Sequence, residues 1–178
     1  AMDQAHYKNG FSVTCHEDAL DIPLHWHKPA RIFVNSMSDL FHRDVPDIFI
    51  ARIFDIMRIT RRHTFMILTK RVERMYALCN LYNQNPAPNV WLGVSVENQK
   101  VADERIPLLL QTPAAIRFLS CEPLLGTIDL AQAGNNACVE WFENGGSGLV
   151  IVGGESGPHC RPMNPDWARS IREQCRSA

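Results

Sequence analysis

Five short apolar segments alternate with longer amphipathic segments along the chain. The apolar segments lie at about residues 31–35, 64–69, 90–95, 116–120 and 149–152. A short continuous apolar run bounded by turn residues predicts a strand buried on both faces, as in parallel sheets. The segments between them carry apolar residues at a spacing of 3.6, as after Pro46, which predicts helices. Strand and helix in turn, five times over, predict a parallel α/β fold with right-handed crossovers.

Polar residues at the expected helix starts sharpen this prediction. Asp44, Asn98 and Asn164 are the expected N-caps, and Pro165 suits a first helical position. The apolar spacing predicts that the second of these helices buries Val72, Met75, Cys79 and Tyr82. By the same spacing, the last helix is expected to bury Trp167, Ile171 and Cys175.

Neither end of the chain shows a further strand, so the expected architecture is a partial TIM-like (β/α) barrel with a parallel sheet of about five strands, incomplete at both ends. The 178 residues suit a single domain, 1–178, with the barrel arc over 11–176. Glycines and two adjacent asparagines between 126 and 148 predict a long surface excursion.

Charge and hydropathy exclude several broad classes of function. The net charge of −1 gives no global field that would recruit nucleic acid or anionic lipid. A local basic cluster at Arg58, Arg61, Arg62 and His63 is interpreted as a solvated helix end. No apolar run approaches the roughly 20 residues of a membrane span, and no signal peptide opens the sequence. A cytoplasmic protein without a membrane partner is therefore expected.

The six cysteines are scattered and form no C-x-x-C pair or compact cysteine–histidine cluster. They are interpreted as free thiols, and no metal site is expected from neighbouring ligands. Cys121, next to Glu122, is interpreted as a core or site-lining residue, since the sequence places no histidine base beside it.

Polar side chains gather where the predicted strands end. Because α/β folds place their sites at the carboxyl ends of parallel strands, these residues predict a site at one rim. They are Asn35, Ser36, Lys70, Arg71, Ser95, Glu97, Glu122, Glu155 and Ser156. An alternative remains open, in which Lys70–Glu97 or Arg71–Glu122 are structural ion pairs that close the rim. Asp39 fits either the site or a turn.

Four blocks of the sequence, in order, resemble the phage-associated gene product thirty-seven/sixty-eight family. They are Pro29–His42, Trp91–Glu97, Arg117–Leu125 and Ile151–Gly157. The resemblance covers about residues 11–176 and implies a radical-S-adenosylmethionine-like barrel in full-length relatives. Such relatives are expected to hold a [4Fe–4S] cluster through an amino-terminal three-cysteine motif, with S-adenosylmethionine on the unique iron.

This chain lacks the three-cysteine segment, so the resemblance implies a fragment that binds no cluster by itself and is inactive alone. By analogy of strand order, Asn35 and Ser36 would hold the amino group of the cofactor, and Ser95 and Glu97 would lie near its ribose. Glu122 and Glu155 would be the catalytic pair facing the substrate. The substrate itself would be held by Asp39, Lys70, Arg71 and Ser156.

Two other classes of function remain open. Exposed edges at the first and last strands would suit a non-catalytic interaction module of a phage or mobile element, which self-associates through those edges. Alternatively, Glu122 and Glu155 would serve as acid and base in a hydrolase or lyase that uses no metal. The sequence specifies neither the substrate nor the macromolecular partner.

Overall fold

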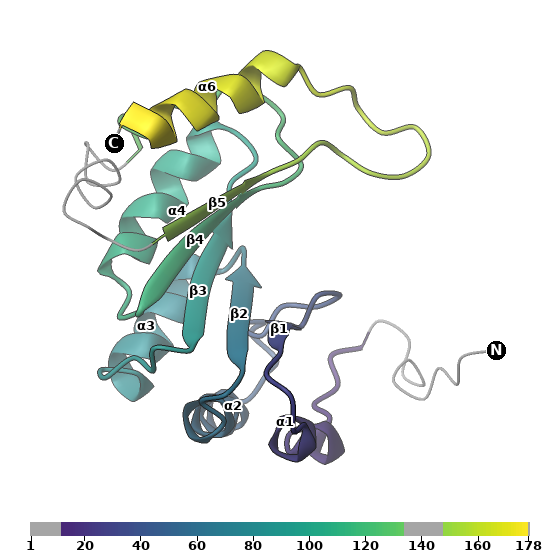
Figure 1. The fold of residues 1–178 in the computed structure, drawn as a ribbon, viewed down its shortest axis with the longest axis vertical. Coiled ribbons are helices and arrows are strands. Elements are labelled where there is room, and N and C mark those ends of the chain that lie inside the picture. The colour runs from purple at the N-terminus through teal and green to yellow at the C-terminus, as the bar shows by residue number, and fades with distance from the viewer. Residues whose placement is uncertain (1–11, 134–147, 178) are drawn as a thin grey trace.

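Five parallel strands in sequence order form the centre of the protein (Figure 1). The computed structural model describes residues 12–133 and 148–177. The strands are β1 (Arg31–Val34), β2 (Thr64–Thr69), β3 (Val90–Ser95), β4 (Ile116–Cys121) and β5 (Gly148–Val152). Each pairs in parallel with the next, in the order β1-β2-β3-β4-β5. The predicted α/β class with a five-stranded parallel sheet is confirmed.

The helices follow the strands in alternation. They are α2 (Asp47–Ile59), α3 (Val72–Tyr82), α4 (Gln99–Gln111) and α6 (Pro165–Ser177), with the short η2 (Glu17–Ala19) and α1 (Ile22–His25) before β1. The strand order never reverses, so right-handed crossovers place all the connecting helices on one face of the sheet. Figure 1 shows α3, α4 and α6 along one side of the strands.

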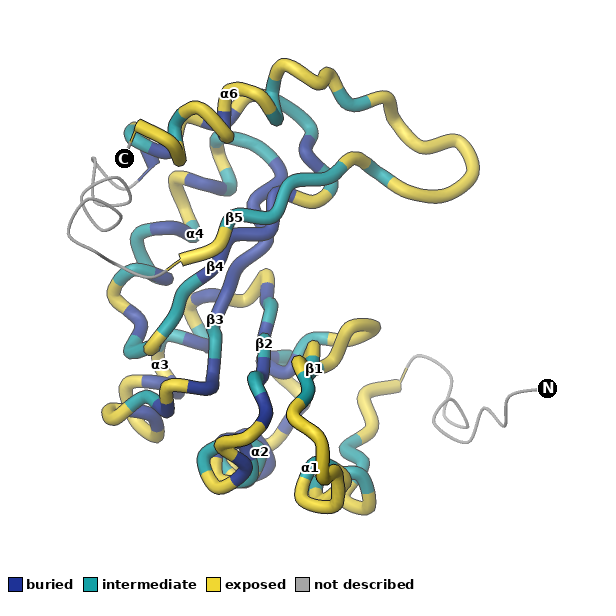
Figure 2. The backbone as a smooth tube through the Cα atoms, viewed as in Figure 1, coloured by how far each residue is buried: buried dark blue, intermediate teal, exposed yellow. Residues whose placement is uncertain are grey.

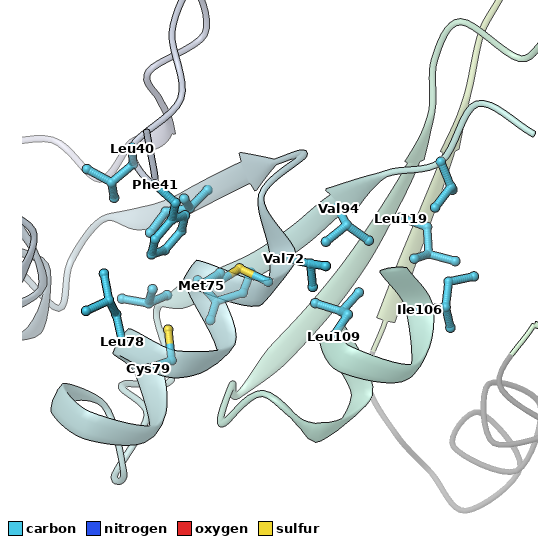
Figure 3. Close-up of a cluster of buried hydrophobic side chains, with 14 of the residues drawn as sticks. Leu40, Phe41, Val72, Met75, Leu78, Cys79, Val94, Ile106, Leu109 and Leu119 are labelled. Carbon is cyan, nitrogen blue, oxygen red and sulfur yellow. The ribbon is translucent and has the colours of Figure 1, made fainter. Parts of the chain in front are cut away.

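The hydrophobic core lies between this face of the sheet and the helices (Figure 3). Alternate residues of β2 are buried, Phe65 and Ile67 among them, as expected where one face meets helices. Leu92 and Val94 of β3 and Leu119 of β4 continue the same layer. The helices contribute the facing side chains, including Phe41, Ile50, Met75, Cys79, Ile106, Leu109 and Ile171.

The opposite face of the sheet, here called the open face, is also apolar but lies outside this core. In register across the strands it carries Phe33, Met66, Leu68, Trp91, Ile116, Phe118, Leu149 and Ile151. The exposed fractions of Phe33 and Leu149 are 43% and 38%. Phe118 is buried, and its ring covers Gly93 of the neighbouring strand. Figure 2 shows the exposed residues of β1 and of the start of β5.

Two of the three predicted N-caps are confirmed. The Asn98 side chain accepts a hydrogen bond from Val101 N, and Asn164 Oδ1 accepts one from Asp166 N. The cap predicted at Asp44 is wrong, because Asp44 lies in a turn and Pro46, with extended backbone, occupies the N-cap position before Asp47.

Two predicted inward positions are also wrong. Tyr82 is 41% exposed and Cys175 is exposed, since each lies in the last turns of its helix, beyond the reach of the sheet. The earlier residues of the same two stripes do face inward: Val72, Met75, Cys79 and Ile171 are buried, and Trp167 packs against the core.

The basic cluster after α2 is only partly a solvated helix end. His63 is buried, with Nδ1 accepting from Ala30 N at 3.2 Å and Nε2 lying 3.0 Å from Pro23 O. The Arg62 guanidinium donates to the carbonyls of Trp26 and Leu24. Both side chains therefore hold the α1 segment against the sheet, a role that a linear charge pattern cannot reveal.

The segment after β4 is fixed by two glutamines. Gln99 of α4 accepts from Asp129 N and donates to Asp129 O, at 2.6 and 3.1 Å. Gln174 of α6 accepts from Leu130 N and donates to Ile128 O, at 2.7 and 2.9 Å. Residues 134–147, most of the predicted excursion, lie outside the described residues. Of the helices in the described ranges, none has both the length and the apolar character needed to cross a bilayer.

Candidate functional site at the carboxyl edge of the sheet

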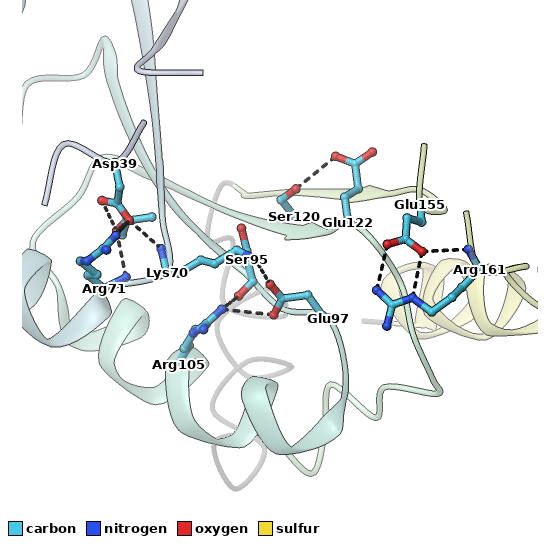
Figure 4. A network of polar contacts seen from close by, with 11 residues as sticks. Asp39, Lys70, Arg71, Ser95, Glu97, Arg105, Ser120, Glu122, Glu155 and Arg161 are labelled. Carbon is cyan, nitrogen blue, oxygen red and sulfur yellow. Dashed lines mark hydrogen bonds and ion pairs between the residues drawn. The ribbon is translucent and has the colours of Figure 1, made fainter. Parts of the chain in front are cut away.

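Most of the predicted site residues lie along the carboxyl edge of the sheet (Figure 4). The strand and loop ends bring four carboxylates to this edge, those of Asp39, Glu97, Glu122 and Glu155. Their partners differ, and these differences separate structural groups from groups that remain available to a ligand.

The Asp39 carboxylate joins the loop after β1 to the end of β2. It accepts hydrogen bonds from Phe41 N at 2.9 Å, from Thr69 Oγ1 at 2.8 Å and from Lys70 N at 3.3 Å. Arg71 Nη1 lies 2.8 Å from its Oδ2. These contacts fit the turn role for Asp39, and Arg71 is its ionic partner.

Glu97 is buried between two cations. Lys70 Nζ lies 2.6 Å from Oε1, and Arg105 Nη1 lies 3.2 Å from Oε2. Arg105 also donates to the backbone carbonyl of Ser95 at 2.6 Å. The structure therefore contains the Lys70–Glu97 ion pair that the sequence analysis gave as an alternative. The sequence analysis missed Arg105, because only the packing of α4 against β3 brings its side chain to this edge.

Glu122 has no cationic partner among the described residues. The Arg71–Glu122 pair is not formed, because Arg71 binds Asp39 instead. Glu122 is exposed and accepts a hydrogen bond from Ser120 Oγ at 3.1 Å. Its side chain lies over Gly153 of the next strand end, where an added Cβ would come within 3.1 Å of Glu122 Cδ. Glycine at 153 therefore lets Glu122 extend across the carboxyl end of β5.

Glu155 is held by Arg161, which the sequence analysis did not single out. Oε2 accepts from Arg161 Nε at 2.8 Å and from Arg161 N at 2.8 Å, and Oε1 accepts from Nη2 at 3.0 Å. These hydrogen bonds lower the pKa of Glu155 to about 2. Glu155 thus remains a carboxylate at neutral pH. Ser156 follows it as an exposed loop residue.

Asn35 and Ser36 do not join the side chains of Figure 4. Asn35 adopts a left-handed backbone conformation, with φ of 57°. It lines a separate cavity of about 350 Å³ between β1, α2 and residues 14–23, whose walls include Val34, Ile53 and Phe65. Ser36 is exposed in the turn after β1. The two residues predicted to hold the cofactor's amino group thus lie beside the β1 edge of the sheet.

Of the six cysteines, Cys138 lies outside the described residues, and the other five form no disulfide bond. Cys79 and Cys121 are buried, and burial raises the pKa of the Cys79 thiol to about 12, so it stays protonated. Within 12–133 and 148–177, no group of three His, Cys, Asp or Glu side chains is arranged to hold a metal ion. The described residues therefore do not fit an iron–sulfur cluster.

Comparison with known proteins gives a family but no activity. Searches of curated proteins and of solved structures found no match. The sequence model of a family described as "Protein of unknown function (DUF5131)" matches residues 1–178. The chain therefore belongs to the DUF5131 family.

Proposed function

We propose that the sheet is one arc of a (β/α) barrel, with the open face as its inner wall. Three features support this. The strand order has no reversal, the helices and core occupy one face, and the other face is apolar without belonging to the core. Inward-facing apolar side chains in layers are typical of barrel interiors.

Within this arc, Glu122 is proposed as the ligand-binding carboxylate. The single observation that carries the proposal is that Asp39, Glu97 and Glu155 each have arginine or lysine partners, whereas Glu122 has only the Ser120 hydroxyl among the described residues. It also lies at the carboxyl rim of the open face, beyond Phe118 and Ser120 of the same strand. A ligand with an amino or hydroxyl group and a flat apolar body suits this combination.

The family resemblance makes S-adenosylmethionine the proposed ligand, in a radical-S-adenosylmethionine-like protein of a phage or prophage. Glu122 and Ser120 would hold its ammonium or hydroxyl groups, and the aromatic residues of the open face would contact its adenine. When bound beside a reduced cluster, this cofactor supplies radical chemistry. The cluster would need ligands beyond the described residues, so no reaction step is assigned to this chain.

Calorimetric titration with S-adenosylmethionine and S-adenosylhomocysteine tests the proposal. Glu122→Gln should weaken binding about tenfold or more, the loss expected for a charge-assisted hydrogen bond. Glu73→Gln, which changes an exposed glutamate of α3, should have no effect. If wild-type protein binds neither compound at millimolar concentration, or if both variants bind equally, the assignment fails.

A second candidate function is an interaction module, favoured by the sheet edges. Among the described residues, β1 and β5 each pair on one side only, and Phe33 of β1 and Leu149 of β5 are exposed. An unpaired edge can accept a strand from another chain. Light scattering should then detect self-association in the micromolar range, which Phe33→Lys together with Leu149→Lys should reduce. A stable wild-type monomer over that range excludes this module.

The acid–base alternative depends on Glu122 alone for proton donation. Glu155, with its pKa of about 2, is ionised at neutral pH and is a weak base. A hydrolase or lyase built on both residues would therefore lose its proton donor in Glu122→Gln and retain activity in Glu155→Gln. Equal loss of turnover in both variants would contradict this assignment of roles.

A further inference from the structure

A second cavity lies at the opposite edge of the sheet, where the strands begin. Its volume is about 510 Å³, and it is bounded by the end of α2, the end of α3 and the loop that leads into β3. Arg58 and Arg61 form one wall, and Leu81 and Tyr82 form another. It shares no residue with the carboxyl-edge site, so its role is independent of the proposed function.

The charged residues that line this cavity are all positive. Two guanidinium groups line it, and no aspartate or glutamate is among its lining residues. Arg58 is engaged, because Nη1 pairs with Asp55 at 2.7 Å and Nη2 contacts Tyr82 O at 3.4 Å. Arg61 is exposed and makes no hydrogen bond or ion pair with any described residue. Its planar group of five donors is free to bind an oxyanion in bidentate geometry.

The cavity also has an apolar wall, whose side chains are more exposed than is usual at a solvated helix end. Leu81 and Tyr82, at the end of α3, line the cavity and are 63% and 41% exposed. The apolar spacing predicts Tyr82 in the core, yet Tyr82 lines this cavity instead. An exposed aromatic ring next to an unpaired guanidinium can bind a ligand that is both flat and anionic.

We propose that this cavity, the Arg61–Tyr82 pocket, binds an organic anion: a phosphate or carboxylate group carried on an aromatic or branched aliphatic body. Arg61 binds the oxyanion, Tyr82 and Leu81 contact the apolar body, and Arg58 adds positive charge while remaining tied to the end of α3. The cavity volume lies within the roughly 300–1,000 Å³ range of small-molecule sites.

Amide chemical-shift titration with phenyl phosphate and benzoate tests this pocket. Both probes combine an oxyanion with an aromatic ring, and the tighter of the two identifies the phosphate or the carboxylate as the preferred group. Inorganic phosphate, which has no apolar body, should bind more weakly. Arg61→Gln should weaken the preferred probe about tenfold or more. Arg61→Lys should restore part of the affinity, because it keeps the charge but not the bidentate geometry.

Two further variants separate a built pocket from general charge. Tyr82→Leu should weaken phenyl phosphate without changing the binding of inorganic phosphate. Arg43→Gln removes a charge from a side chain that is 88% exposed, away from the pocket, and should change nothing. The proposal is overturned if neither probe binds at millimolar concentration, or if Arg61→Gln and Arg43→Gln have the same effect.

Discussion

The contact between Gly93 and Phe118 on the open face gives the sharpest prediction of the structure. A Cβ at position 93 would lie 2.6 Å from three ring atoms of Phe118. Carbon atoms pack at about 3.5–4.0 Å, so the ring would have to move by roughly 1 Å. Phe118 is buried, which leaves little room for that movement. Overpacking of this kind costs about 1–3 kcal/mol in the free energy of unfolding.

The same substitution has a favourable side, because alanine restricts the unfolded chain and gains about 0.4–1 kcal/mol. Gly93→Ala should therefore destabilise the protein by about 1–2 kcal/mol, measured by urea unfolding. In a Phe118→Ala background the clash is absent, so adding Gly93→Ala should be neutral or stabilising. This change of sign is specific to the pair.

Gly126→Ala is the matched control, since a Cβ there would meet nothing within 4 Å. It should leave the unfolding midpoint unchanged or raise it slightly. If Gly93→Ala costs the same with and without the Phe118 ring, the close packing across the open face is refuted.

Three further predictions concern the carboxyl edge. Gly153→Ala should change the stability little, because the Glu122 side chain can rotate away from the added Cβ. It should nevertheless weaken the binding of S-adenosylmethionine, as Glu122→Gln does. Unchanged affinity in calorimetry would contradict the proposed role of Glu122. The pKa of Glu155 lies below its usual 4.5, so this group stabilises the fold above pH 4.5 and loses its contribution as the pH falls towards 2. Arg161→Gln should flatten the profile of stability against pH over this range and raise the titration midpoint of the Glu155 carboxyl group measured by NMR. An unchanged midpoint would count against the Glu155–Arg161 pair. Asp39→Ala removes several hydrogen bonds and an ion pair, and it should lower the free energy of unfolding by about 2–3 kcal/mol in chemical denaturation. A loss below about 0.5 kcal/mol would show that these contacts are not maintained in solution.

The sequence predicts the strands well, since apolar runs bounded by polar residues are a local signal. Helix ends are predicted less well. Tyr82 continues the apolar spacing of α3, but the spacing does not record where the sheet stops covering the helix. Asp44 is a good cap by residue type, yet Pro46 sets where the helix begins.

The carboxyl edge shows the same division between local and tertiary signals. Strand ends identify the residues that reach the edge, but the choice of ionic partner depends on packing. Arg105 reaches Glu97 from α4, and Arg161 reaches Glu155 across a loop. A linear sequence cannot decide that Arg71 binds Asp39 rather than Glu122. The availability of Glu122 thus emerges only from the three-dimensional structure.

The way α6 is attached has a consequence for how the protein opens. Ile171 is its one buried residue in the described structure, Trp167 is only partly buried against the core, and Gln174 adds two hydrogen bonds to the chain after β4. A helix with so few buried contacts should detach in partial unfolding events before the rest of the sheet melts. Amide hydrogen exchange would then be fastest in α6 and β5, and slowest in the central strands. Each such event would remove β5 and Gly153 from beside Glu122, and it would leave the Arg61–Tyr82 pocket intact.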